Sequence, residues 1–195
     1  DTSLVLGKHS GRHAFSDALE KMGLRVQGDA LNQAFARFKE LADRKVEITD
    51  ADLEAIVAAE LNVAASDAFE LSSIEFRGSN VGPASAKVVL VRTADGEKVE
   101  AAGEGDGMID AAGQAIRAGT GIDGRQTDFN VSSVTGGVEA LGDVVFHFES
   151  EGSKVSGRGV STDVVEASAR ALLNAINKIV RIRDRAEVRD LETGP

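Results

Sequence analysis

Two segments of this chain place several glycines directly before a helical pattern, and both suit the binding of a small anion. The second segment, Gly157–Asp163, runs into the helical pattern Val164–Val180, and the first, Gly103–Asp110, repeats its design. We expect each to be a strand that ends on glycines and presents the free N–H groups of a new helix N-terminus. Such an end favours a negatively charged group.

An acidic side chain beside such a helix start would complete a site for a small zwitterion. The helix-start amides would take a carboxylate, and Asp163, whose partner position in the first segment is Asp110, would take an ammonium group. Apolar strand residues would enclose an aliphatic side chain. A structural alternative stays open, in which Ser161, Thr162 and Asp163 only cap a helix and the glycines only allow close packing.

The similarity of the two segments extends to what surrounds them, over about 110 residues in all. Asp110-Ala111 matches Glu166-Ala167, and Lys87–Val91 matches Asp143–His147, both at an offset of 56 residues. Each copy reads as three strands, separated by turn residues, and then one helix. We therefore predict two βββα units that pack as a pseudo-twofold pair around a shared core.

The N-terminal third of the chain has helical periodicity instead. An apolar stripe runs along residues 31–42, and Thr49 is a good N-cap for a further helix. We predict an α+β protein in which a helical linker subdomain, residues 1–65, precedes a domain of two pseudo-symmetric βββα units, residues 66–185. The charged residues 186–195 are expected to form a flexible tail.

Composition narrows the possible partners. The formal net charge of −10 argues against a nucleic-acid surface, because phosphate contacts need clustered Lys and Arg. The chain has no cysteine, so neither a disulfide framework nor thiolate chemistry is expected, which fits a reducing compartment. No run approaches the roughly 18 apolar residues of a membrane span. We expect a cytoplasmic protein with neither a nucleic-acid nor a membrane partner.

The segment Gly7–Phe15 contains two histidines, one lysine and one arginine ahead of a helical pattern. A metal site from His9 and His13 would need further ligands, which no cysteine or nearby histidine supplies, so we predict no metal here. General acid–base chemistry by either histidine is reasonable, because imidazole titrates near neutrality. No nucleophile motif, phosphate-binding loop or dinucleotide fingerprint accompanies them.

Taken together, Gly7–Phe15, Thr120–Asp123 and Gly157–Ala171 closely resemble the C-terminal half of the 2-isopropylmalate synthase family. The resemblance covers essentially the whole chain. It implies an acyltransferase of leucine biosynthesis that condenses acetyl-CoA with 2-oxoisovalerate in a metal-dependent (β/α)₈ barrel. It also implies a helical linker and a C-terminal domain of two βββα units, which dimerises and binds leucine as an allosteric feedback inhibitor.

The resemblance implies a set of leucine-binding residues at the two glycine segments and on a neighbouring strand. Asp163 is the residue expected to take the ammonium group. The alignment of the strand valines is looser than that of the glycine segments. The expected effector-binding residues are Gly105, Gly107, Ile109, Asp110, Val131, Val134, Val138, Gly159, Val160, Ser161, Thr162 and Asp163.

The chain also departs from the family pattern, because it contains no His-x-His metal pair and no strand–helix alternation before Gly7. We therefore expect a regulatory fragment without the barrel, inactive alone and needing no cofactor, since the divalent metal belongs to the barrel. His9 would assist catalysis only in the full-length enzyme. Two alternatives stay open: the isoleucine-binding domain of the related citramalate synthase, and a dimerisation module that binds no effector.

Overall fold

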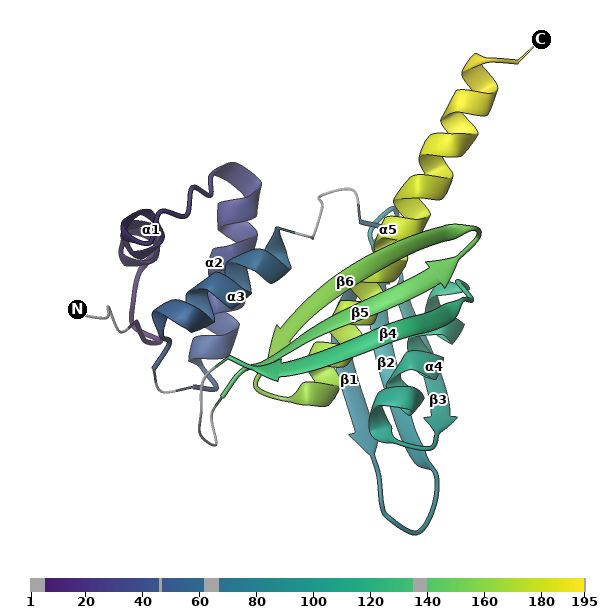
Figure 1. Ribbon diagram of the computed structural model, residues 1–195, viewed down its shortest axis with the longest axis horizontal. Helices are drawn as coiled ribbons and strands as arrows, with labels where there is room; N and C mark the ends of the chain where they lie inside the picture. Colours follow the sequence, from purple (N-terminus) through teal and green to yellow (C-terminus); the bar gives the residue numbers. More distant parts are fainter. Residues whose placement is uncertain (1–5, 46, 62–66, 135–139, 195) are drawn as a thin grey trace.

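The chain folds into a helical part followed by two βββα units, which confirms the predicted α+β class (Figure 1). The computed structural model describes residues 6–45, 47–61, 67–134 and 140–194. The helical part contains α1 (Arg12–Lys21), α2 (Gly28–Ala42) and α3 (Asp50–Glu60).

The three N-terminal helices form because their apolar residues recur at helical spacing and meet in one core. Phe15 of α1 packs against Phe35 and Phe38 of α2, with ring centroids 5.5 and 5.0 Å away. The predicted N-cap of α3 is confirmed: the Thr49 hydroxyl accepts a bond from the Asp52 amide, and the Asp52 carboxylate accepts one from the Thr49 amide. This capping box fixes where α3 begins.

Each βββα unit is a three-stranded antiparallel sheet, in the order of the chain, followed by a helix. The hairpin between the second and third strands of each unit turns at a glycine, Gly96 or Gly152, whose φ angles of 71° and 78° favour this residue. The first unit contains β1 (Phe69–Arg77), β2 (Ala84–Arg92), β3 (Lys98–Gly105) and α4 (Met108–Thr120). The second contains β4 (Arg125–Ser133), β5 (Gly142–Ser150), β6 (Ser153–Ser161) and α5 (Val164–Glu192).

The internal repeat is real, but the middle strands are aligned differently from the sequence comparison. The N-caps of α4 and α5, Gly107 and Asp163, lie 56 residues apart, which confirms the helix offset. The position that corresponds to Asp163 is therefore Gly107, and the expected partner position Asp110 is wrong. Val88 of β2 pairs with Ala101, however, whereas the residue paired with Gly157, 56 positions after Ala101, is Phe146. Val88 and Ala101 are 13 positions apart, but Phe146 and Gly157 are only 11 apart, so the second copy has two fewer residues between its middle and last strands. The middle strands are therefore offset by 58 positions, and the predicted strand offset of 56 is wrong.

The two helices lie between the two sheets and contact each other. Helix α4 packs on β2 and β3 of its own unit, while α5 packs on β5 and β6 and also reaches β1 of the first unit (Figure 1). The side chain of Asn177 fastens this crossing by hydrogen bonding to both the amide and the carbonyl of Phe69 at the start of β1. The shared core is consequently asymmetric, since α5 serves both sheets.

Strand β4 is the exposed edge of the second unit. Val131 and Phe129 lie opposite Val144 and Phe146, so they share the face on which α5 covers β5 and β6. Phe129 is half-buried, packs against the shared core and has its ring edge-on to Phe146. Val131 is 44% exposed, so the apolar face of β4 is only partly covered.

Two features differ from the expected organisation. The core of the helical part includes Leu141 and Val160, which come from the second βββα unit, so residues of both parts close that core. The tail expected at 186–195 is helical through Glu192, as the end of α5, with every residue from 182 to 194 exposed. Arg, Glu and Ala favour helix strongly enough to continue the element beyond the sheets.

Candidate functional site

The junction between β6 and α5 is held by the side chain that we expected to receive an ammonium group. Both Asp163 capping bonds end on Oδ1, which accepts from the amides of Val165 at 2.8 Å and Glu166 at 2.9 Å. The carboxylate therefore occupies the positive end of α5 itself. The capping role left open by the sequence is confirmed, and a further contact of Asp163 with a ligand stays a prediction.

The corresponding junction between β3 and α4 is built differently. Its N-cap, Gly107, places no side chain over the first turn, and a Cβ there would meet nothing within 4 Å. Asp110 turns back toward its own loop, where Oδ2 accepts a bond from the Asp106 amide at 3.1 Å. Ile109 packs against the shared core. The start of α4 thus has no side-chain cap, although Asp110 lies in its first turn.

Apart from Gly107, the glycines before these helices lie within strands and serve close packing. A Cβ on Gly159 would lie 2.6 Å from the Ala171 amide nitrogen and closer still to the Ala167 carbonyl oxygen. Gly105 is crowded in the same way by Asp110 and Ala111. The close-packing role that the sequence left open for these glycines is therefore confirmed, because they bring the helix backbone onto the sheet.

The remaining predicted effector residues divide between the two cores. Val131 lies opposite Val144, which in turn pairs with Gly159, so these three share one face of the second sheet. Val134 packs with the helical part, and its amide donates to Leu141. Val138 lies outside the described residues. The predicted residues of the second unit thus gather near the end of β6, apart from those at the start of α4.

A cluster of charged residues that the sequence did not reveal surrounds this junction. Glu166, in the first turn of α5, is bonded by Ser161, by Arg44 at 2.6 Å and by Arg170 at 3.1 Å. Arg37 is 6% exposed and donates to the Val160 carbonyl at 2.8 Å. Only the Glu166–Arg170 pair has a local signal, since it spans four residues of one helix.

The pKa of Glu166 reflects these contacts. Burial alone would raise it, but the hydrogen bonds from Ser161 and Arg44, together with the charges of Arg170 and Arg37, lower the pKa to about 2. The carboxylate is therefore ionised at neutral pH. A buried anion held by cations from two different parts of the fold ties those parts together.

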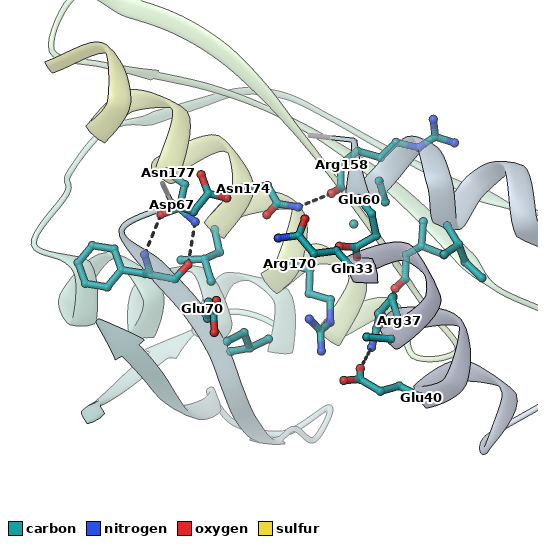
Figure 2. A pocket seen from close by; sticks show the side chains of 18 residues that line it. Gln33, Arg37, Glu40, Glu60, Asp67, Glu70, Arg158, Arg170, Asn174 and Asn177 are labelled. Atoms are coloured by element: carbon teal, nitrogen blue, oxygen red, sulfur yellow. Dashed lines mark hydrogen bonds and ion pairs between the residues drawn. The ribbon is translucent and has the colours of Figure 1, made fainter. Parts of the chain in front are cut away.

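A cavity of about 240 Å³ lies beside this cluster, where α2 and α3 face β1, β6 and α5 (Figure 2). Gly159 and Val160 line it, but none of the other predicted effector residues that the structure describes does. Polar side chains that line it already donate hydrogen bonds within the chain: Asn174 donates to the Arg158 carbonyl, and Arg37 donates to Glu40 (Figure 2). We therefore interpret it as a gap between two parts of the chain and do not assign the effector to it.

The basic N-terminal motif lies on the surface of the helical part. His9 is exposed and shares a shallow depression with Lys8, Ser10 and Arg44. In the described part of the chain, no three His, Cys, Asp or Glu side chains are grouped so as to hold a metal ion. The divalent metal that the resemblance assigns to a barrel thus finds no fitting ligand set among these residues. Within the same residues, none of the helices is long and apolar enough to cross a bilayer.

Comparison with known proteins identifies relatives over nearly all of the sequence. Residues 47–180 match the LeuA allosteric (dimerisation) domain, and residues 1–46 match the homocitrate synthase post-HMGL domain-like family. The chain is 54% identical over 188 residues to the 2-isopropylmalate synthase of Acidimicrobium ferrooxidans, covering 96% of this chain and 36% of that protein. The 2-isopropylmalate synthases of Pelotomaculum thermopropionicum and Brevibacillus brevis are 46% and 45% identical to this chain. Each of these matches covers 92% of this chain and 35% of the relative. The chain spans about a third of the length of these relatives.

Proposed function

Because this chain belongs to the LeuA allosteric (dimerisation) domain family, we propose that it binds L-leucine as the feedback signal of a 2-isopropylmalate synthase. The family match covers both βββα units, and the relatives carry that enzyme name. In the whole protein, the condensation of acetyl-CoA with 2-oxoisovalerate would take place in another domain. His9 would assist that reaction, and this chain alone, in the cytoplasm or in solution, would transfer no acyl group.

One observation carries the choice of a zwitterionic effector: the two helix starts of the repeat are chemically unequal. The start of α4, capped by Gly107, offers amides to a ligand carboxylate. Oδ1 of Asp163 caps α5, and Oδ2 can accept a hydrogen bond from an ammonium group. Valines of the second sheet supply an apolar wall for an aliphatic side chain.

The test is calorimetric titration of the purified chain with L-leucine, L-isoleucine and D-leucine. We expect L-leucine to bind most tightly. Binding of isoleucine alone would assign the chain to the citramalate synthase relative, and no binding by any of the three would support the assembly-only alternative. Ligand at about 100 times its dissociation constant should add roughly 2.7 kcal/mol of stability, which melting experiments resolve easily.

Substitutions at the two helix starts separate capping from ligand binding. Asp163→Ser keeps an acceptor for the cap but removes the charge, whereas Asp163→Ala removes both. Both variants should bind L-leucine at least about tenfold more weakly, and only the alanine variant should lose about 1 kcal/mol of stability. Gly107→Asp should fill the start of α4 with a carboxylate and block binding without destabilising the fold, since a Cβ there meets nothing within 4 Å. Unchanged affinity in all three variants would refute the site assignment.

We also propose that the chain forms a homodimer, in keeping with the description of its family as a dimerisation domain. The partly covered apolar face of β4, on which Val131 is 44% exposed, supports this, because such faces are normally covered by another element or another copy. Sedimentation at micromolar concentration should give twice the 20.4 kDa chain mass. A dimer that is unaffected by Val131→Asp would exclude this face as its interface.

A further inference from the structure

Two arginines of the helical part grip the junction between β6 and α5. Arg37 of α2 reaches across to donate to the Val160 carbonyl at 2.8 Å, a contact between residues 123 positions apart. Arg44, just after the end of α2, donates to Glu166 in the first turn of α5 at 2.6 Å. Val160 is one of the predicted effector residues, and Glu166 follows Asp163, another of them, by three positions.

Glu166 connects these arginines to the junction itself. Its Oε2 atom accepts from both Arg44 and the Ser161 hydroxyl, while Oε1 accepts from Arg170. Ser161 is fully buried, and its Oγ atom also accepts the Asp163 amide at 3.2 Å. A single chain of hydrogen bonds therefore leads from Arg44 through Glu166 and Ser161 to the residue that caps α5. We call Arg37, Arg44, Glu166 and Ser161 the junction clasp.

The clasp lies at a loosely filled part of the boundary. The 240 Å³ cavity separates α2 and α3 from β1 and α5 on one side, and both Arg37 and Arg170 line it (Figure 2). Glu60 also faces this cavity, and burial raises its pKa against the opposing effect of Arg37 and Arg170. Where a cavity replaces packed side chains, directional polar contacts determine how the two parts sit against each other.

We propose that the junction clasp couples the conformation of the β6–α5 junction to helix α2, with Glu166 as the positioning residue between them. This inference rests on the proposed function in one respect, namely that leucine is the ligand whose arrival perturbs the junction. A ligand that draws Asp163 or Ser161 toward itself must reorient the bonds to Glu166, and Arg44 then loses or changes its partner. Helix α2 would register occupancy of the effector site without touching the effector.

A double-mutant cycle read by amide hydrogen exchange in α2, residues 28–42, tests the coupling without any ligand. Ser161→Ala disturbs the junction, and it should change exchange in α2 about fivefold in the otherwise unchanged chain. The same substitution made in Glu166→Gln should leave α2 exchange where Glu166→Gln alone puts it. Additive effects of the two substitutions would overturn the proposal, because additivity means that Glu166 does not connect the two sites.

Leucine provides the second arm of the experiment. In the wild-type chain, saturating L-leucine should change α2 exchange about fivefold, and in Arg44→Gln it should still bind but leave α2 unchanged. Arg44→Lys should restore part of the response. Arg125→Gln is the matched control, since it removes the same charge from an exposed pair with Glu149 far from α2. Leucine that binds without any effect on α2 overturns the coupling. If leucine does not bind at all, the proposed function fails, and the double-mutant cycle alone then tests whether the junction clasp couples the β6–α5 junction to α2.

Discussion

Replacing Gly159 by alanine distinguishes a glycine needed for packing from a glycine needed for a ligand. A Cβ at this position would lie 2.6 Å from the Ala171 amide nitrogen, and the Ala167 carbonyl oxygen would be closer. Both atoms belong to the backbone of α5, so neither can swing aside as a side chain would. That contact would have to lengthen by at least 0.8 Å to reach 3.4 Å, where ordinary contact begins.

The cost follows from moving the helix that serves both sheets. Extra atoms in a well-packed core typically cost 1–3 kcal/mol, and a radial gap of 0.5–1 Å forfeits a quarter to a half of each dispersion contact. Because α5 buries residues against β1, β5 and β6, we place Gly159→Ala at the upper end, about 3 kcal/mol. For a chain of this size, this corresponds to a fall in melting temperature of roughly 6–12 °C.

The assay is thermal and urea unfolding followed by circular dichroism, with Gly107→Ala as the matched control. Gly107 is also a predicted effector residue before a helix, but a Cβ there meets nothing within 4 Å and its φ of −145° suits any residue. The control should lose less than about 1 kcal/mol. If both variants unfold at the same temperature, close packing of α5 on β6 is not the reason for glycine at 159.

Two further predictions concern buried charges. The pKa of Glu166 is lower in the folded chain, about 2 against 4.5, so its contribution to stability is fully present above pH 4.5 and is lost as the pH falls toward 2. This contribution is about 2 kcal/mol once residual solvent screening is allowed for. As the pH falls over that interval, the urea midpoint of Glu166→Gln should therefore fall less than that of the wild-type chain. Equal acid dependence of the two proteins would contradict this. Lys45→Met should cost about 3–5 kcal/mol in urea unfolding, because it removes the partner 2.7 Å from the fully buried Asp52 carboxylate. Adding Asp52→Asn should recover part of the loss, and a single variant within 1 kcal/mol of wild type would show that the ion pair is not needed.

The elements that could be predicted are those with a strong local signal. The capping box at Thr49 is contained within four residues, and the turn at Gly96 follows from the conformational freedom of glycine. The repeat was likewise visible because the N-caps at Gly107 and Asp163 keep a constant spacing. The register of the middle strands could not be predicted, because the loops before them differ in length between the two copies. Buried and exposed residues alternate with a period of two in a strand, so offsets of 56 and 58 fit the pattern equally well.

The site was less predictable because its chemistry depends on distant partners. A sequence pattern could mark Asp163 as either a cap or a ligand contact, but not decide between them. The bonds from Arg37 to Val160 and from Arg44 to Glu166 join residues more than 120 positions apart, and no periodicity connects them. Such contacts arise only when the tertiary structure brings the end of α2 near the β6–α5 junction.

The unequal helix starts also set a stoichiometry. A duplicated domain would ordinarily offer two equal places per chain for a carboxylate, but the start of α5 already holds the carboxylate of Asp163. Of the two helix starts, the proposed site leaves the start of α4, at Gly107, for an incoming anion. The proposed site thus predicts one effector per chain, so a dimer would saturate at two equivalents of effector and not at four.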